Sequence, residues 1–226
     1  MAYFPILINL ENKKCLIVGA GEVGFRKAKL LAQFNPKKIV IVDPKINSSI
    51  KEELNKISSV ELLERSFCEK DLEDKDLVIA STNDSNLNHK ISELCKKKKI
   101  LCNVVDVPDL SSFIVPAILN MEDLIIAVST SGGSPALAKK IKEEIRGLFG
   151  EEYKVWIKIL KKLRPHILNL KLGKEKNREI FNLLTQKDVL VLIQKKDKKG
   201  LKNKILSITS SKLKNIIDEI IDECVN

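Results

Sequence analysis

The sequence predicts an α/β protein in which a parallel sheet with crossover helices is followed by two strands, a helix and a small all-α domain. Three observations lead to this fold class. Short strand-like and helix-like segments alternate over residues 1–113, a glycine-rich turn follows the first of these strands, and only helical periodicity is visible after residue 150. The 226 residues suffice for one ordinary domain and a smaller appendage.

The first 113 residues contain short apolar segments rich in Val and Ile, as expected for strands that are buried on both faces. We expect strands, in chain order, at residues 15–18, 39–42, 60–63, 77–80 and 100–105. We expect the helices at residues 22–34, 48–57 and 86–95.

After residue 113 the pattern changes to two apolar strands, 113–119 and 124–129, around a polar turn. A helix then begins with Ser134 as its N-cap and Pro135 at its first position, and it ends near Gly147 and Gly150. Further helices are expected at residues 153–170, 178–184 and 213–221, and residues 195–204, with six lysines in ten positions, are expected to form a solvated loop. We therefore divide the chain into residues 1–113, 114–150 and 151–226.

Composition narrows the class of protein. Hydrophobic residues make up 44% and charged residues 31%, which is typical of a globular protein, and every apolar run is far shorter than the ~20 residues that span a bilayer. No secretory hydrophobic region opens the sequence, so we expect a cytoplasmic protein without a membrane partner. The five cysteines form no C-x-x-C pair and have mostly apolar flanks, which favours core packing. With two histidines, no zinc site of the usual kind is expected.

The positive charge is concentrated in the C-terminal half. Residues 1–113 contain 18 Lys and Arg against 16 Asp and Glu, a net charge of +2, whereas residues 114–226 contain 22 against 14, a net charge of +8. This asymmetry suggests an anionic partner for the second half, although lysines can also serve only to solvate a surface. Nucleic acid is not expected as the partner, because aromatic residues make up only 4% and no recognition motif is present.

The turn Gly19-Ala20-Gly21-Glu22-Val23-Gly24 directly follows a strand and opens a helix, which is the context of a dinucleotide-binding Rossmann fingerprint. Gly19 permits the tight turn, Gly21 lets a pyrophosphate approach the backbone, and Gly24 allows close packing of helix and strand. Asp43 lies 19 residues beyond Gly24, at the end of the second strand, where a carboxylate can bind the ribose 2′-OH. It would repel a 2′-phosphate, so the expected cofactor is NAD rather than NADP.

Three further segments contain candidate site residues. Thr82 lies in a polar run after the strand 77–80, where it could line the cofactor or help to cap the next helix. Asp106 follows the strand 100–105 and could act as a general base beside a nicotinamide, although Pro108 and Asp109 also suit a plain turn. The loop 129–135 could bind an anion through its backbone N–H groups or could simply be a flexible connection with a capping serine.

Five motifs in order resemble the precorrin-2 dehydrogenase family, which forms the dehydrogenase portion of siroheme synthase. They are residues 3–6, 15–24, 102–106, 112–116 and 127–138. The match extends over about residues 1–150, and the helical tail matches only in general character. The resemblance implies NAD-dependent oxidation of precorrin-2, an anionic tetrapyrrole, to sirohydrochlorin. It also implies a homodimer joined through the dimerisation segment 114–150.

The resemblance also assigns roles to individual residues. Asp106 would take the proton as a hydride leaves for NAD. The cofactor contacts that the resemblance implies are Gly19, Gly21, Glu22, Val23, Gly24, Asp43 and Pro44. From their positions in the sequence we also expect Thr82 to contact the cofactor and Asn103, Ser131, Gly132 and Gly133 to contact the substrate. In some bifunctional members a serine that can be phosphorylated occupies the place of Thr130. Two alternatives stay open: the same cleft could also insert Fe²⁺ as a ferrochelatase, or the chain could be a non-catalytic NAD-sensing module.

Overall fold

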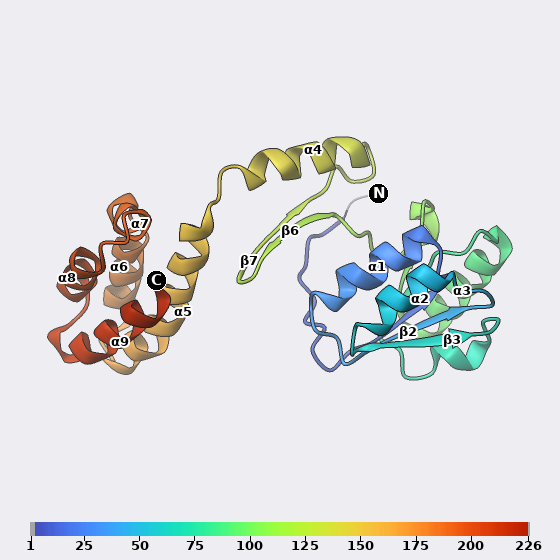
Figure 1. Ribbon diagram of the computed structural model, residues 1–226, viewed down its shortest axis with the longest axis horizontal. Helices are drawn as coiled ribbons and strands as arrows, with labels where there is room; N and C mark the ends of the chain where they lie inside the picture. The colour runs from blue at the N-terminus through green and yellow to red at the C-terminus, as the bar shows by residue number, and fades with distance from the viewer. Residues whose placement is uncertain (1–2, 226) are drawn as a thin grey trace. The chain divides into compact units, whose positions relative to one another are not determined.

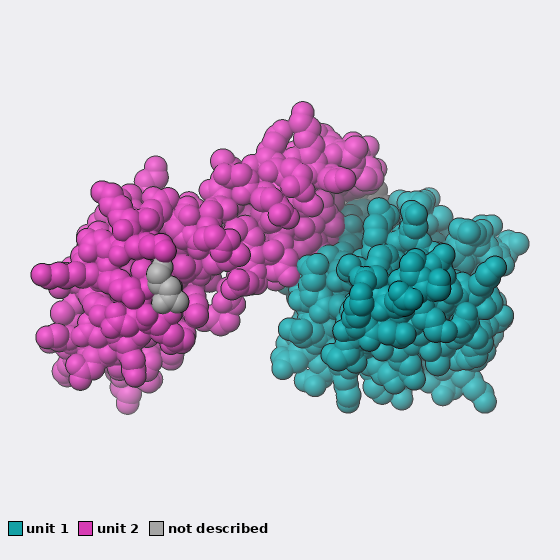
Figure 2. Space-filling view, viewed as in Figure 1, with its two compact units in different colours: residues 1–115 teal, residues 116–226 magenta. Residues whose placement is uncertain are grey.

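The computed structural model describes residues 3–225, and the chain folds as two compact units with the division between Val115 and Pro116 (Figure 2). The first unit is built on a five-stranded parallel sheet with the strand order β3-β2-β1-β4-β5, which confirms the predicted Rossmann-type fold. Its strands are β1 (Lys14–Val18), β2 (Lys38–Asp43), β3 (Val60–Glu64), β4 (Leu77–Ala80) and β5 (Leu101–Val104). Its helices are α1 (Glu22–Ala32), α2 (Ser48–Asn55) and α3 (Ser85–Lys98), with short 3₁₀ turns η1 (Glu69–Leu72) and η2 (Pro108–Leu110).

Both faces of the sheet are covered, because alternate residues of each strand point to opposite sides. Cys15 and Ile17 of β1 pack in one core with Ala28 and Leu31 of α1 and with Leu54 of α2. The other face, which includes Leu16 and Val18, packs in a second core with Ile91 and Cys95 of α3. Helices α1 and α2 therefore lie on the same side of the sheet, as Figure 1 shows.

The strand order reverses at β1, which is hydrogen-bonded to β2 on one side and to β4 on the other. Val18 lies beside Val42 of β2 and beside Ala80 of β4. The residues that follow these three strands consequently meet at the carboxyl edge of the sheet, which is where open α/β sheets bind ligands.

The second unit begins with an antiparallel hairpin of β6 (Ala117–Met121) and β7 (Leu124–Val128), against which α4 (Pro135–Arg146) packs. Ser134 caps α4 by accepting the N–H of Leu137, with Pro135 at the first helical position, as predicted. The remaining elements are helical: α5 (Glu151–Asn169), α6 (Lys174–Leu184), α7 (Lys187–Gln194), α8 (Lys198–Ile208), the 3₁₀ turn η3 (Ser211–Leu213) and α9 (Lys214–Cys224). Among residues 3–225, no helix combines the length and the apolar character needed to cross a membrane.

The prediction of a solvated loop at residues 195–204 is wrong, because α8 begins at Lys198. Leu201 and Ile205 are fully buried in the helical core, while Lys202 and Lys204 form ion pairs with Asp222 and Asp188. Asp197 accepts the N–H of Gly200 at 2.9 Å and so starts the helix. The preceding helix α7, which was not predicted, is held in the same core by Val189 and Ile193.

The predicted strand at residues 113–119 begins too early, since β6 starts only at Ala117. Phe113 instead packs against the core of the first unit, and its carbonyl accepts a hydrogen bond from the side-chain amide of Asn103 at 3.1 Å. Pro116 has no N–H to donate to a neighbouring strand. The expectation that the cysteines are core residues is confirmed for four of them, but Cys68 is exposed.

The burial of α8 predicts that Leu201→Ala will lower the free energy of unfolding of the second unit by about 2–5 kcal/mol, because it leaves a cavity in the helical core. Trp156 is the single tryptophan of the chain, and its Nε1–H donates to the carbonyl of Leu184 at 3.0 Å, so its fluorescence reports the unfolding of this unit in urea. Lys199→Ala, at an exposed position of the same helix, should change the free energy by less than about 0.5 kcal/mol. Equal effects of the two substitutions would contradict the packing of α8.

Candidate functional site

The turn between β1 and α1 can be built only from glycine at two positions. Gly19 has a φ of 101°, and a Cβ atom there would lie 2.6 Å from the carbonyl oxygen of Ser81. Gly24 is buried under the turn, and its Cβ would overlap the carbonyl oxygen of Gly19. The absence of side chains at these positions therefore lets α1 start directly against the sheet.

Gly21 has a different role, because a Cβ atom at this position would meet nothing within 4 Å. Gly21 is the N-cap residue of α1 and has ordinary extended backbone angles. No side chain caps α1, so its first turn, which begins with Glu22 and Val23, presents N–H groups without a side-chain acceptor. An open surface beside unpaired N–H groups and the positive end of a helix dipole suits a pyrophosphate.

Asp43 holds the glycine turn in place. Its Oδ2 atom accepts the N–H of Ala20 at 2.7 Å, and its Oδ1 atom accepts the N–H of Lys45 at 2.8 Å. The carboxylate is half-buried, whereas the next residue, Pro44, is exposed. The carboxylate therefore lies at the glycine turn and holds its backbone in place.

Ser81 opens the polar run that was expected to line the cofactor or to cap the next helix, and its contact with the glycine turn was not predicted. Its hydroxyl lies 3.1 Å from the carbonyl oxygen of Val18 and 3.0 Å from that of Gly19, so it ties β4 to the start of the turn. The only signal in the sequence was its position directly after β4, in the polar run that drew attention to Thr82.

The hydroxyl of Thr82 takes part in the start of α3. It donates to Oδ1 of Asn88 at 2.7 Å and accepts the N–H of Asp84 at 3.2 Å. Asp84 is the N-cap of α3 and accepts N–H groups of the first helical turn at 2.9 and 3.1 Å. The polar run thus caps the helix, and a cofactor contact of Thr82 would be made in addition to this network.

Asp106 occupies the turn that follows β5. The turn is closed by the N–H of Val107, which donates to the carbonyl of Val104 at 3.3 Å, and Asp106 itself has a φ of 60°. Its side chain is exposed, and within residues 3–225 its carboxylate accepts no hydrogen bond. Asp tolerates the left-handed region better than most residues, but such conformations are concentrated at functional sites.

Asn103 is buried three residues before Asp106, and its amide nitrogen donates to the carbonyl of Phe113. Two serine hydroxyls also connect this segment to β5, as hydrogen-bond acceptors. Ser111 accepts the N–H of Val104 at 2.9 Å, and Ser112 accepts the N–H of Cys102 at 2.8 Å. These bonds fasten the returning chain along β5. They therefore fix the two ends of the segment that contains Asp106.

The glycine- and serine-rich loop, residues 129–135, belongs to the second unit, and hydrogen bonds within the loop stabilise its conformation. Thr130 accepts the N–H of Ser134 through Oγ1 and the N–H of Gly133 through its carbonyl, both at 2.9 Å. Ser129 accepts the N–H of Ser131 at 3.1 Å, and both Ser131 and Gly132 have a positive φ. Of the predicted substrate contacts, Ser131 and Gly133 thus already use their N–H groups within the loop.

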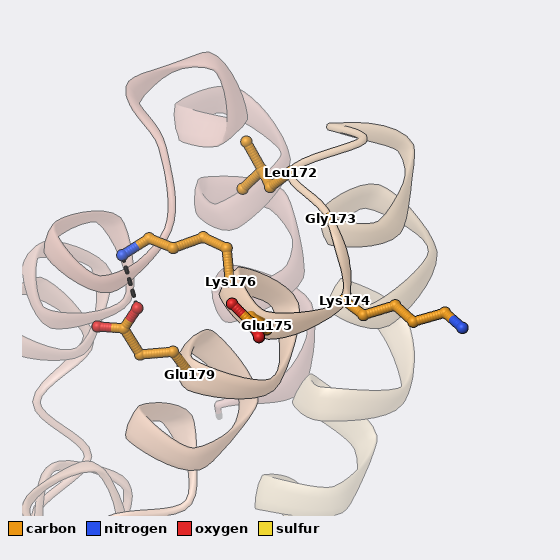
Figure 3. A pocket seen from close by; sticks show the side chains of 6 residues that line it. All are labelled: Leu172, Gly173, Lys174, Glu175, Lys176 and Glu179. Carbon is orange, nitrogen blue, oxygen red and sulfur yellow. Dashed lines mark hydrogen bonds and ion pairs between the residues drawn. The ribbon is translucent and has the colours of Figure 1, made fainter.

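A pocket of about 510 Å³ lies at the start of α6, and none of the predicted site residues lines it. Figure 3 shows that the ammonium group of Lys176 is hydrogen-bonded to the carboxylate of Glu179, while the side chain of Lys174 points away from this pair. The hydrogen bond is 2.7 Å long. The pocket is lined by Leu172, Gly173, Lys174, Glu175, Lys176 and Glu179. Acidic and basic groups alternate here, so the pocket has no clear preference for a charged ligand.

Comparisons with known proteins agree with this geometry. Residues 6–117 match the family described as "Putative NAD(P)-binding", and residues 123–148 match the family described as "Sirohaem biosynthesis protein central". Siroheme synthase of Nitrosomonas eutropha is 40% identical over 153 residues, and that of Psychromonas ingrahamii is 39% identical over 148 residues. These alignments cover 68% and 66% of the present chain but only 32% and 31% of the two relatives. The chain thus spans about a third of the length of these relatives.

The solved structure of "SirC, precorrin-2 dehydrogenase" has the same fold over nearly the whole chain. Its TM-score is 0.69 and its sequence identity is 22%, with coverage of 98% of the present chain and 100% of that chain. The helical tail, which neither family model reaches, is included in this likeness.

Because Gly21 borders open space and Gly24 is tightly packed, we predict that substitutions at these two positions will affect folding and nucleotide binding differently. Gly21→Ala should leave the urea midpoint unchanged, because its Cβ points into open space, but should weaken NAD⁺ binding at least ~10-fold by blocking the approach of the pyrophosphate. Gly24→Ala should lower both the stability and the affinity, because its Cβ overlaps the Gly19 carbonyl. Isothermal titration with NAD⁺ and urea unfolding check this pair. Unchanged NAD⁺ affinity of Gly21→Ala would argue against the turn as the pyrophosphate site.

Proposed function

This chain belongs to the siroheme synthase family, and from that membership we propose that it is an NAD-dependent dehydrogenase that oxidises precorrin-2 to sirohydrochlorin in siroheme biosynthesis. The observation that carries the proposal is the exposed, unpaired carboxylate of Asp106 on the turn after β5, at the same edge of the sheet as the glycine turn. A non-catalytic NAD sensor needs the glycine turn and Asp43 but has no use for such a carboxylate.

Cofactor binding is assigned to the glycine turn, with Glu22, Val23 and Gly24 at the start of α1 and Asp43 with Pro44 after β2. The open surface at Gly21 and the uncapped N–H groups of α1 fit a pyrophosphate. A carboxylate oxygen can accept more than one hydrogen bond, so Asp43 can bind a ribose hydroxyl while it keeps the N–H of Ala20. We therefore propose NAD rather than NADP.

The reaction removes a hydride and a proton from the substrate. Bound NAD⁺ supplies the acceptor for the hydride, and Asp106 accepts the proton. A carboxylate without internal hydrogen bonds suits this role, because no existing partner has to be displaced before the proton is taken up. Asn103 stabilises the base of the Asp106 turn, and we keep Asn103, Ser131, Gly132 and Gly133 as proposed substrate contacts.

We also propose that two copies form a cytoplasmic homodimer through residues 114–150, with residues 1–113 as the nucleotide domain and 151–226 as the helical domain. Strands β6 and β7 pair only with each other among the described residues, which leaves one edge of each strand open. Apolar side chains of this segment are exposed, among them Ile125 at 37%, Leu137 at 49% and Leu148 at 70%. A C₂ dimer would cover them. Sedimentation of the full chain at micromolar concentration should give a dimer, and a monomer would refute this assignment.

The function is tested by following NADH formation with precorrin-2. The unmodified protein should form NADH, and Asp106→Asn should lower kcat by about 10² to 10⁴, as expected when a general base is removed. The affinity for NAD⁺ should stay the same, because the amide does not alter the glycine turn. Asp109→Asn, an exposed acid three residues away, is the matched control and should keep its activity. Wild-type turnover by Asp106→Asn would show that Asp106 is only a turn residue.

The choice of cofactor is tested with two substitutions of Asp43. The unmodified protein should bind NAD⁺ much more tightly than NADP⁺. Asp43→Asn should narrow this difference by removing the negative charge while it still accepts the N–H of Ala20. Asp43→Ala should also narrow it, but with a general loss of affinity because the turn is no longer held. Titration calorimetry measures the affinity of each protein for both nucleotides, and equal affinities of the unmodified protein would disprove the assignment.

A further inference from the structure

Lys27 is a half-buried lysine of α1, one turn beyond Gly24. Within residues 3–225 its ammonium group forms neither an ion pair nor a hydrogen bond. Its neighbour Lys29, on the exposed side of the same helix, lies 3.9 Å from a carboxylate oxygen of Glu53 and 5.2 Å from the ring centroid of Phe25. The two lysines are therefore close in sequence but differ in whether their charge is compensated.

The acid whose charge acts on Lys27 is Asp106. Burial lowers the pKa of Lys27, the positive charge of Arg26 lowers that pKa further, and the negative charge of Asp106 raises it. Phe25 of α1 and Val105, the residue before Asp106, pack against the same core, so α1 and the start of the turn after β5 lie on the same face of the sheet. Lys27 and Asp106 nevertheless do not form an ion pair. Partly buried charges are normally paired or hydrogen-bonded, so an ammonium group without a partner has capacity for an anion.

The position of Lys27 indicates which anion its ammonium group would bind. The N-terminal turn of α1 and Asp43 account for a pyrophosphate and a ribose. Lys27 lies one turn further along the helix, which packs on the face of the sheet where Val105, the residue before Asp106, is also packed, and β4 separates β5 from β1. The substrate, rather than the phosphates, is expected beside Asp106, and that substrate has many carboxylates.

We propose that Lys27 is a substrate-binding residue whose ammonium group binds a carboxylate of the tetrapyrrole next to Asp106 and so places the reacting carbon at this acid. The inference rests on the proposed function and adds to it a specific contact in the first unit. Nothing in the composition indicated it, since the first half of the chain has almost no excess of positive charge.

The test compares Lys27→Met, which keeps the length and the apolar stem, with Lys27→Arg, which keeps the charge, and with Lys29→Met as the matched control. The dissociation constant for sirohydrochlorin is measured by absorption titration, which needs no turnover, together with KM for precorrin-2, kcat and the NAD⁺ affinity. Lys27→Met should raise the sirohydrochlorin constant and KM by about 10- to 100-fold, as expected for the loss of a charge-assisted hydrogen bond. Lys27→Arg should recover most of this loss, and Lys29→Met should behave as the unmodified protein.

The outcomes separate this inference from the proposed function. If the unmodified protein oxidises precorrin-2 and Lys27→Met binds sirohydrochlorin normally, the inference is overturned and the function stands. If the NAD⁺ affinity falls instead, Lys27 serves a phosphate and the inference is equally wrong. If the unmodified protein neither binds sirohydrochlorin nor forms NADH, the proposed function itself fails. Urea unfolding shows whether each variant is folded, and Lys27→Gln, with the same expected loss, replaces Lys27→Met if that variant is not.

Discussion

The close approach of α1 to the end of β1 is the constraint on which the rest of the site depends. Since no side chain fits at Gly19 or Gly24, the helix begins directly where the strand ends, and its uncapped N–H groups face the carboxyl edge of the sheet. The alignment of Val18 with Val42 and Ala80 then brings Asp43 and Ser81 to the same turn. Both use a hydrogen bond to the turn's backbone to hold it. A turn whose backbone is already held by such hydrogen bonds loses little ordering entropy when a ligand binds to it.

Polar groups at this edge fall into two sets. Thr82, Asn103 and the serines after Asp109 have their hydrogen bonds satisfied within the protein, and they determine its shape. Gly21, Asp106 and Lys27 offer open surface, an unpaired carboxylate and an unpaired ammonium group. A polar group that bonds no other protein atom is free to bind a ligand, which makes such groups at this edge of the sheet the best candidates for recognition and chemistry. Asn103, a proposed substrate contact, belongs to the first set because its amide already donates to the carbonyl of Phe113.

Local patterns sufficed to predict the five strands, the glycine turn and the cap at Ser134, because each depends on residues close together in sequence. Predictions that depend on tertiary contacts were less reliable. Residues 195–204 were predicted to be a loop because of their many lysines. Leu201 and Ile205, four residues apart, are nevertheless buried on one face of α8, and this packing stabilises the helix. Phe113 has the apolar character of a strand residue, but it packs against the core of the first unit, and its carbonyl accepts a hydrogen bond from Asn103. The role of Ser81 and the uncompensated charge of Lys27 arise from neighbours about 60 to 80 residues away, which no local pattern contains.

The charge of the second half illustrates why summed charge is a weak guide to a binding site. Many of its lysines are paired locally: Lys154 with Glu151, Lys161 with Asp123, and Lys202 with Asp222. Exposed pairs of this kind contribute little to stability and leave little field to attract a ligand at physiological salt. Lysines such as Lys195 and Lys199 are exposed to solvent, so an anion gains little by displacing their water. A single half-buried ammonium group without a partner in the protein binds a carboxylate more specifically, because water competes less for it. The near-neutral first half can therefore make the decisive contact with an anionic substrate.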